Sequence, residues 1–439
     1  MKKEVKIGLI GYGTIGQGVV RLLKENKKEI QSRLGAQLKL VGVADKDWKR
    51  KRKYPLEKSL RLNDAYQLIN NPEIDIIIQL VGDFPGVKEM LIASLKTGKY
   101  VVTANKAVLA KYGKEIFQTA VRTGSQIFFE ASVGGGIPVL RALRTGLCAN
   151  QIQEIYGIVN GTCNYIITEM EQGRGEYKDV LKEAQRLGYA EADPGADVEG
   201  IDALHKLVIL VLLGYGVSLD INKIYREGIS DLSLLDFRTA RDLGYRLRLL
   251  AIARQENGFI DARVHPTLIP ANSLLAKVEG VYNAIYVRGN FVGPTLFYGQ
   301  GAGMEPTASA VVSDVMELAR NLLSGKKSSG IKSSGYYQEN PRQLKFKPIE
   351  ELKMPYYLRL WVLDQPGVLA KISGILAKHK ISIRSVIQRE GREGDSVPLV
   401  IITHLALEKS VQKAVREINR LKVVIQPAKV IRILTELEK

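Results

Sequence analysis

The chain has 439 residues, enough for about three domains of ~150 residues each, and its 45% hydrophobic and 25% charged residues exclude a disordered or fibrous protein. Two cysteines and four histidines are too few for a disulfide framework or a multi-ligand zinc site, and the longest apolar run, residues 207–216, is too short to cross a membrane. The net charge of +18 comes without a nucleic-acid-binding motif, and no signal-peptide pattern is visible, so we expect a cytoplasmic protein that binds neither nucleic acid nor a membrane.

The first part of the chain alternates short apolar strands with helices. The strands are predicted at residues 5–10, 38–44, 74–81, 100–103 and 126–130. The first helix is expected to begin near residue 15. This alternation is typical of an α/β fold with a parallel, doubly wound sheet of the Rossmann type. We expect this domain to cover residues 1–134, with a helix near residues 304–323 packing back on it.

The remainder of the chain divides into three further parts. Helical patterns at residues 177–187 and 201–213, followed by strand-like stretches, predict a mixed α/β second domain at residues 135–323. Residues 324–353 are rich in Ser, Gly, Lys and Pro, a composition typical of an exposed linker. The tail, residues 354–439, shows the β-α-β-β-α-β order of a ferredoxin-like domain.

A glycine motif lies between the first predicted strand and the first helix. Gly11, Gly13 and Gly16 have the GxGxxG spacing: the first glycine permits a tight turn, the second lets the backbone approach a pyrophosphate, and the third lets the helix pack on the strand. The N-terminus of the helix then faces the phosphates. Because the motif is correctly flanked, it predicts a dinucleotide site rather than only a glycine-rich turn.

The end of the second strand bears on the choice between NAD and NADP. An acidic residue there binds the ribose 2′-hydroxyl of NAD, whereas basic residues accommodate the 2′-phosphate of NADP. Asp45 favours NAD, but Lys46 and the basic run at residues 49–53 surround the same position with positive charge. We expect NADP, with Lys46 at the phosphate, and leave NAD open. A solvated surface loop is the alternative interpretation of the basic run.

Five further motifs occur in order along the chain. They are VVTANKAVLA at residues 101–110, EASVGGGIP at 130–138, NGTCNYI at 160–166, EADPGADVEGIDALHKLVIL at 191–210 and GQGAGMEPTASAVVSD at 299–314. With the glycine loop, they make residues 1–325 resemble homoserine dehydrogenase, and residues 364–388 resemble an ACT domain, a regulatory module that binds amino acids. The resemblance implies reversible NAD(P)-dependent hydride transfer between L-homoserine and L-aspartate 4-semialdehyde, in threonine, methionine and isoleucine biosynthesis. It also implies that residues 135–323 form the catalytic and dimerisation domain.

Asp202 and Lys206 carry the clearest chemical pattern. They are four residues apart in a predicted helix and therefore share a face, and the apolar stretch at residues 207–213 would bury them. A surface ion pair is the alternative. A lysine removed from water releases its proton more readily and can exchange it with the reacting oxygen. The resemblance makes Lys206 the proton donor and acceptor and gives Asp202 the role of orienting it.

The resemblance also assigns residues that bind cofactor and substrate. Lys106 follows a predicted strand at the carboxyl edge where open α/β sheets bind ligands, and a cation there would stabilise developing alkoxide charge. By resemblance, the residues at the cofactor are the three motif glycines, Thr14, Ile15, Thr103, Asn105, Lys106 and Gly303, and those at the substrate are Glu191 and Asp197. Lys46 is added to the cofactor set because of its place beside the basic run. The alternatives are a lysine that merely begins a helix and an acidic loop that faces solvent.

The stretch EASVGGGIP offers a site for a hard cation. One carboxylate, that of Glu130, is followed by carbonyl groups that the glycines make accessible, and a monovalent cation such as sodium suits such a site. By resemblance, the ligands are Glu130, Val133, Gly135 and Ile137. From the residues alone, glycines that permit close domain packing are the default interpretation.

The tail domain suggests regulation and assembly. ACT domains commonly pair edge to edge and bind amino acids at the interface, so Asp364, Gly367 and the strand at residues 381–388 are the expected pocket. The resemblance implies L-threonine as the effector, and a dimerisation module without a ligand is the alternative. We expect a homodimer or a higher homo-oligomer.

Two other classes of function remain open. Cys163 could be the nucleophile of a thiol-dependent semialdehyde dehydrogenase, although no histidine is an obvious partner base. The tail could make the chain a non-catalytic amino-acid sensor, although the lysines and carboxylates of the motifs argue against this. One stretch departs from the family: QLVGDFPGV, residues 79–87, lacks the second glycine usual after the third core strand.

Overall fold

The computed structural model describes residues 4–82, 84–325, 335–336, 341–388 and 395–435. The chain forms two compact units, each assembled from separate stretches of sequence. The first comprises Met1–Val159, Leu204–Ile221 and Tyr282–Leu344, and the second comprises Asn160–Ala203, Asn222–Val281 and Lys345–Lys439. No helix in the described part of the chain is long and apolar enough to span a membrane.

The first unit contains the expected parallel sheet with helices between its strands. The strand order is β3-β2-β1-β4-β5-β6 and every neighbouring pair is parallel, which confirms the doubly wound fold. The strands are β1 (Glu4–Ile10), β2 (Gln37–Ala44), β3 (Arg61–Leu62), β4 (Ile76–Gln79), β5 (Tyr100–Thr103) and β6 (Ile127–Phe128). The helices are α1 (Thr14–Glu25), α2 (Lys27–Leu34), α3 (Ala65–Ile69), α4 (Val87–Lys96) and α5 (Lys106–Thr123). The order reverses between β1 and β4, the point at which such sheets bind ligands.

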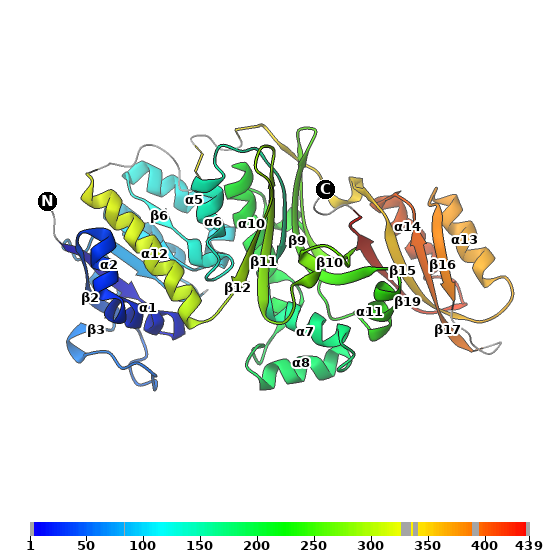
Figure 1. Cartoon of the computed structure of the whole chain (residues 1–439), viewed down its shortest axis with the longest axis horizontal. Helices are drawn as coiled ribbons and strands as arrows, with labels where there is room; N and C mark the ends of the chain where they lie inside the picture. Colours follow the sequence, from blue (N-terminus) through cyan, green and yellow to red (C-terminus); the bar gives the residue numbers. More distant parts are fainter. Residues whose placement is uncertain (1–3, 83, 326–334, 337–340, 389–394, 436–439) are drawn as a thin grey trace. The chain divides into compact units, whose positions relative to one another are not determined.

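Helix α12 (Met304–Leu323) returns to this sheet from much later in the chain. Its buried side chains, including those of Val311 and Val315, belong to the same hydrophobic core as the strands. Figure 1 shows α12, in yellow, beside α1, in blue. A Cβ atom at Gly18 would lie 2.7 Å from the side chain of Met304, so the absence of a side chain lets the two helices approach closely.

An antiparallel ladder completes the first unit. It consists of β7 (Ile152–Ile158), β11 (Tyr282–Gly289) and β12 (Gly293–Gln300) in the order β12-β11-β7. Helix α10 (Ile201–Tyr215) is almost entirely buried, and a Cβ atom at Gly214 would lie 2.8 Å from the side chain of Ile155 on β7. The boundary between the units falls within α10, after Ala203.

The second unit is built on a long hairpin. Strands β9 (Tyr245–Glu256) and β10 (Phe259–Pro270) pair in an antiparallel manner along their full length. The short strands β8 (Tyr225–Arg226) and β13 (Lys345–Phe346) pair with β10 in parallel. The helices of this part are α7 (Gly161–Glu171), α8 (Tyr177–Arg186), α9 (Gly195–Val198) and α11 (Leu234–Asp242).

The tail adopts the expected ferredoxin-like order. Its elements are β15 (Tyr356–Leu363), α13 (Val368–Lys378), β16 (Ile383–Gln388), β17 (Ser396–Thr403), α14 (Glu408–Ile418) and β19 (Val424–Ile433). The strands lie in the order β19-β15-β17-β16, and both helices contribute to one core with the sheet. Strand β19 also pairs with β10 through Thr267 and Arg432, so the tail sheet continues the sheet of the hairpin.

The segment expected to be an exposed linker is packed at its end. Besides β13, residues 345–354 contain a short 3₁₀ turn (Ile349–Glu351) and β14 (Lys353–Met354), which pairs with β18 (Ala406–Leu407). Ile349, Leu352 and Met354 are buried in the core of the tail domain. Their irregular spacing explains why periodicity did not reveal them. Residues 326–334 and 337–340 of the expected linker lie outside the described residues.

Candidate functional site

The glycine loop connects β1 to α1 at the point where the sheet order reverses. Gly11 has a φ of 97°, in the region that favours glycine, and a Cβ atom at Gly16 would overlap the carbonyl oxygen of Gly11. Around Gly13, by contrast, a Cβ atom would meet nothing within 4 Å. The loop is therefore closed on its protein side and open at Gly13, as the approach of a pyrophosphate requires. Thr14 and Ile15 are the first residues of α1.

Asp45, at the end of β2, is held against the glycine loop. Its carboxylate accepts the backbone N–H of Tyr12 at 2.7 Å and that of Asp47 at 2.9 Å, and it forms an ion pair with Arg52 at 3.1 Å. Arg52 also donates from Nε to the carbonyl oxygen of Tyr12 at 3.0 Å, and its guanidinium lies 4.9 Å from the ring centre of Trp48. A buried arginine thus neutralises the acidic residue that favoured NAD.

The basic run divides into one buried and several exposed cations. The side chain of Arg52 is only 8% exposed, whereas Lys46, Lys49 and Lys51 are exposed. The ammonium of Lys46 lies 5.1 Å from the ring centre of Phe84, in the loop after β4. Sequence reasoning grouped Arg52 with the exposed run, because its contacts with Trp48 and Asp45 depend on the folded loop.

Polar side chains link the carboxyl ends of β4 and β5. The hydroxyl of Thr103 donates to the side-chain carbonyl of Gln79 at 2.7 Å, and the Asn105 backbone N–H donates to Thr103 Oγ1 at 3.1 Å. The side-chain amides of Gln79 and Asn105 both donate to the carbonyl oxygen of Val81, at 2.9 and 3.2 Å. These hydrogen bonds fix the edge of the sheet at which a cofactor would bind. Sequence reasoning missed the part that Gln79 plays in them.

Lys106 is the first residue of α5, directly after the N-cap Asn105, whose side chain accepts the N–H of Val108 at 3.1 Å. A cation in the first turn of a helix opposes the helix dipole. The lysine is half-buried at this position. An unfavourable position at the ligand-binding edge of the sheet favours a functional role over a lysine that merely begins a helix.

Asn160 joins the acidic residues of the second unit. Its side-chain amide donates to Asp197 at 2.7 Å and to Asp202 at 2.9 Å, while its side-chain carbonyl caps α7 by accepting the N–H of Cys163 at 2.8 Å. The hydroxyl of Thr162 donates to Asp197 at 3.2 Å. Asn160 therefore holds together the carboxylates of Asp197 and Asp202, both of which are predicted site residues. The Asn-Gly pair before an apolar helix is the signal for such a cap, but it does not reveal contacts 37 and 42 residues away.

Lys206 lies one turn after Asp202 on α10, and both side chains are buried, each residue being 8% exposed. The ammonium of Lys206 donates to the carbonyl oxygen of Val159 at 2.6 Å. Burial of both residues excludes the alternative of a solvent-exposed ion pair. Because α10 is a rigid apolar helix, the ammonium is held at a defined position.

Glu191 and Asp197 lie in the segment between α8 and α10, with Asp197 in the short helix α9. Glu191 is exposed, and the Gln185 side chain donates to its carbonyl oxygen at 3.1 Å, which anchors the loop to α8. Asp197 is held by Asn160 and Thr162 as described above. The carboxylate of Glu191 is exposed and therefore accessible to a ligand. Among the described residues, no ion pair to Glu191 is found.

Glu130 differs from its expected setting. Strand β6 ends at Phe128, and Glu130 begins a 3₁₀ turn instead of ending the strand. Its buried carboxylate accepts the N–H groups of Leu140 and Arg141 at 2.9 and 2.7 Å, and its own N–H donates to Asp314 at 2.8 Å. Burial and the neighbouring Asp314 raise the pKa of Glu130 to about 7. A bound cation would favour the ionised form.

The other residues of the expected cation site lie in the loop after Glu130. Gly135 has a φ of 53°, and a Cβ atom there would lie 2.6 Å from the backbone of Gly301, so close packing alone accounts for this glycine. The carbonyl oxygen of Ile137 accepts the N–H of Val139 at 2.8 Å. A carbonyl oxygen has a second lone pair, so the oxygens present remain compatible with a monovalent cation. In the described part of the chain, no cluster of His, Cys, Asp and Glu could hold a metal.

The thiol of Cys163 is buried in α7. Its sulfur lies 3.1 Å from the carbonyl oxygen of Asp197, and the residue is 0% exposed. A catalytic thiolate requires partial exposure and a cationic or basic partner. This environment instead indicates a structural cysteine.

Comparisons with known proteins agree with this geometry. Residues 11–130 match the family described as homoserine dehydrogenase, NAD-binding domain, residues 138–316 match homoserine dehydrogenase, and residues 356–423 match the ACT domain. The homoserine dehydrogenase of Helicobacter pylori is 44% identical over 99% of this chain and 100% of its own, and that of Pseudomonas aeruginosa is 42% identical over 98% and 99%.

Solved structures give the same result. A homoserine dehydrogenase from Thiobacillus denitrificans has a TM-score of 0.92 and 42% identity, covering 99% of both chains. A hyperthermophilic archaeal homoserine dehydrogenase in complex with NADPH has a TM-score of 0.61 and 27% identity, covering 72% of this chain and 97% of its own.

Proposed function

Because the chain belongs to the homoserine dehydrogenase family, we propose that it catalyses reversible hydride transfer between L-homoserine and L-aspartate 4-semialdehyde, with NADP as cofactor. The observation that carries the assignment of the catalytic residues is the buried Lys206, one helical turn after Asp202. The alternative of a thiol enzyme is disfavoured by the burial of Cys163.

The residues of the chain would handle the proton and the charge of the reaction. A bound nicotinamide would supply the acceptor for the hydride of the carbinol carbon of homoserine. The amine of Lys206 takes the hydroxyl proton and returns it in the reverse direction, with Asp202 orienting it. Lys106 stabilises the developing alkoxide, and Glu191 and Asp197 bind the polar groups of the amino acid. Asn160 is a positioning residue that holds the two aspartates.

The proposal distinguishes three classes of function in one assay. The purified enzyme should reduce NADP⁺ with L-homoserine in the absence of phosphate, because hydride transfer from an alcohol needs no acyl intermediate. The rate of NADPH formation at 340 nm, compared with that for NAD⁺, is the measurement. Oxidation of the semialdehyde that requires phosphate would instead indicate a thiol enzyme, and no turnover with either substrate would indicate a sensor.

The preference for NADP is supported by the setting of Asp45. Its charge is paired with the buried Arg52, and its oxygens already accept two backbone N–H groups, so it is poorly placed to discriminate against a 2′-phosphate. Lys46 is exposed beside this pair, where it could meet the phosphate. The NADPH bound to the archaeal relative supports the same cofactor.

Arg52→Gln should weaken NADP binding by about 10-fold or more while changing NAD binding by less than about 3-fold, because Asp45 would then repel the 2′-phosphate. Lys46→Ala should have the same sign with a smaller effect. Kd values from quenching of protein fluorescence measure both. Lys51→Ala, an exposed lysine of the same run, is the matched control. Equal losses for NADP and NAD in Arg52→Gln would contradict the assignment.

We also propose a monovalent cation, sodium, at Glu130, Val133, Gly135 and Ile137. The donor set supports it: one buried carboxylate whose pKa is raised, together with carbonyl oxygens, which are ligands for hard cations. Such a cation would compensate the buried charge and hold the loop between β6 and α6 (Val139–Arg141) in place. Comparing thermal unfolding in sodium and tetramethylammonium chloride at equal ionic strength tests this role.

For the tail we propose regulation by L-threonine at the ACT domain. Its support is the domain match and the position of Asp364, whose carboxylate accepts the side-chain N–H of Gln388 at 3.0 Å and thereby joins the residue after β15 to the last residue of β16. Gly367 has a φ of 86° and directly precedes α13, so the N-terminus of that helix follows the same loop. Part of the loop between β16 and β17 lies outside the described residues.

Asp364→Ala should abolish inhibition by threonine while leaving turnover without threonine within about 2-fold of the parent enzyme. Coupling of the usual 1–3 kcal/mol would change apparent substrate affinity by about 5–150-fold in the parent. Initial rates titrated with threonine measure the effect. Unchanged sensitivity in the variant would place the effector elsewhere, and insensitivity of the parent would contradict threonine as the effector.

A further inference from the structure

A cavity lies where the tail domain joins the hairpin of the second unit. Its volume is about 260 Å³, and its walls come from β9, β10, residues 347–354 and the end of β19. Drug-sized ligands occupy pockets of roughly 300–1,000 Å³, so this cavity suits a smaller molecule. It is built entirely from the second unit and does not include the site residues described above.

The floor of the cavity is polar and buried. Asp261, Arg263, His265 and Thr267 alternate along β10 and therefore share one face of the strand. Arg263, 4% exposed, bonds to Asp261 and donates from Nε to Nε2 of His265 at 3.2 Å. His265 is therefore an acceptor, and burial with two neighbouring arginines holds its pKa well below the ordinary value. A charged and hydrogen-bonded floor is unusual for a strand that only packs a core.

The walls add cations from three other elements. Arg254 on β9, Lys347 after β13 and Lys353 on β14 line the cavity, together with the carboxylates of Glu256 and Glu351. These five residues are half-buried or exposed, so they surround the more open part of the cavity. Cations outnumber carboxylates on the lining as a whole, which favours a ligand that carries a carboxylate.

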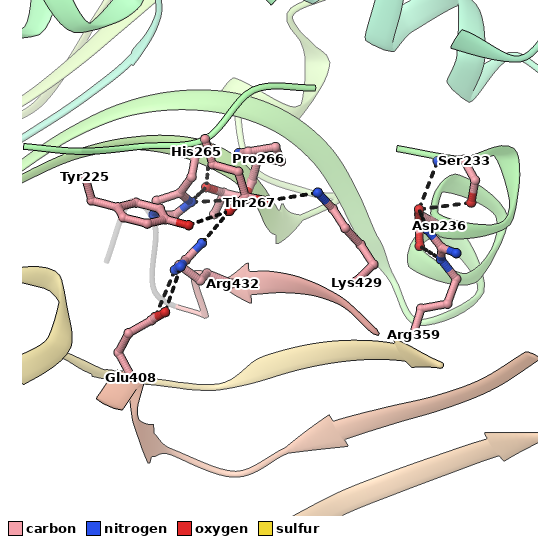
Figure 2. A network of polar contacts seen from close by, with 11 residues as sticks. Tyr225, Ser233, Asp236, His265, Pro266, Thr267, Arg359, Glu408, Lys429 and Arg432 are labelled. Atoms are coloured by element: carbon pink, nitrogen blue, oxygen red, sulfur yellow. Dashed lines mark hydrogen bonds and ion pairs between the residues drawn. The ribbon is translucent and has the colours of Figure 1, made fainter. Parts of the chain in front are cut away.

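Arg432 forms the boundary between this cavity and the body of the second unit. It donates from Nε and Nη2 to Glu408 at 2.9 and 2.7 Å, and from Nη1 to Glu227 at 2.8 Å. Figure 2 shows Arg432 on β19 pointing between His265 and Glu408. A guanidinium has five N–H groups, and these bonds use three of them. The residue is 1% exposed and is held by partners from two domains.

Glu227 connects Arg432 to the segment between α8 and α10 that carries Asp197, which we call the substrate loop. Lys429 also donates to Glu227 at 2.9 Å, and the segment that follows Glu227 packs on the loop carrying Asp197. The Ile229 N–H donates to the carbonyl oxygen of Val198 at 2.9 Å, and a side chain at Gly228 would collide with that same carbonyl. Arg432 is therefore connected to Val198, the residue next to Asp197, through the side chain of Glu227 and the backbone of residues 228 and 229.

We propose that this cavity is a second effector site, which binds a small carboxylate of amino-acid size and acts on the substrate loop through Arg432 and Glu227. A carboxylate bound at the cations would compete with Glu227 and Glu408 for Arg432 and loosen the segment at residues 227–229. The expected effect is a rise in the KM for homoserine of about 5-fold or more, within the usual range of coupling between sites. This effect on KM rests on the proposed function, whereas binding does not.

Binding is tested by calorimetry on the full-length protein, with succinate, L-aspartate and L-threonine as probes at constant ionic strength. At least one probe should bind saturably, and Arg254→Gln combined with Lys347→Gln should weaken that binding at least 10-fold. Lys345→Gln, an exposed lysine on β13 outside the cavity lining, should bind as the parent does. If the double variant does not fold, Lys347→Gln alone decides by the same criterion.

The calorimetric outcomes distinguish binding in this cavity from binding at the ACT pocket around Asp364. Binding that survives Asp364→Ala but not the cavity substitutions supports the proposal, whereas binding lost in Asp364→Ala alone overturns it. No saturable binding of any probe, or equal binding in the cavity variant, also overturns it. Glu227→Gln should retain binding and lose the change in KM. If the parent does not oxidise homoserine, the proposed function fails while the calorimetric result stands.

Discussion

Lys206→Met should lower kcat for homoserine oxidation by about 10²–10⁴-fold, the usual contribution of a positioned acid or base. Methionine retains most of the apolar stem of the lysine in its buried helix, so the substitution removes the amine without leaving a large cavity. The bond to the carbonyl oxygen of Val159 is also lost, at a cost of about 1–3 kcal/mol for an acceptor left unsatisfied. Steady-state kinetics and thermal unfolding separate the two effects.

The controls for Lys206→Met address binding and charge. Kd for NADP should change by less than about 3-fold, because in the proposed mechanism the amine acts on the substrate oxygen and not on the phosphates of the cofactor. Lys178→Met, on the exposed face of α8, removes the same charge and should leave kcat unchanged. Turnover of Lys206→Met within about 3-fold of the parent would exclude Lys206 as the proton carrier.

Much of the fold could be predicted because each domain has a strong local pattern. The strand at residues 356–363 was predicted with the bounds that β15 has, since its side chains are nearly all buried and turn residues follow it. The packing of the helix near residues 304–323 on the sheet was expected, but no local pattern shows it, because α12 is about 280 residues from α1. The packed segment at residues 345–354 escaped detection because its apolar residues follow no period and are buried by α14 and β18.

Less of the site could be predicted in detail. The sequence singled out Asp202 and Lys206 by their types and helical spacing, which are local, and the structure confirms that both are buried on α10, whereas their chemical role stays a prediction. It did not identify Arg52 as the partner of Asp45 or Asn160 as the residue that joins Asp197 and Asp202, since these contacts form only when distant segments meet. The same limit applies more strongly to the cavity at Arg432, whose walls come from four separate segments.

Arg432→Met should lower the free energy of unfolding by about 3–5 kcal/mol, the usual cost of removing one partner from a buried ion pair. Glu408, 1% exposed, would lose two hydrogen bonds, and Glu227 would lose one of its two cations. Urea unfolding followed by circular dichroism measures the change. Arg416→Met, on the exposed face of α14, removes the same charge and should cost less than about 0.5 kcal/mol.

The pH dependence of stability gives Arg432→Met a second readout. Burial by itself raises the pKa of Glu227, but Lys429 and Arg432 outweigh it and hold the pKa below the ordinary value of 4.5. A carboxylate with a depressed pKa adds stability above 4.5, and this stability is lost as the pH falls through the folded-state pKa. The parent should therefore lose stability more steeply than Arg432→Met on acidification below that value.

Adding Glu408→Gln to the variant should recover part of the loss at neutral pH, because it removes the buried charge left unpaired. Equal stability of parent and variant at every pH would show that β19 is held by its backbone pairing with β10 and not by these ion pairs.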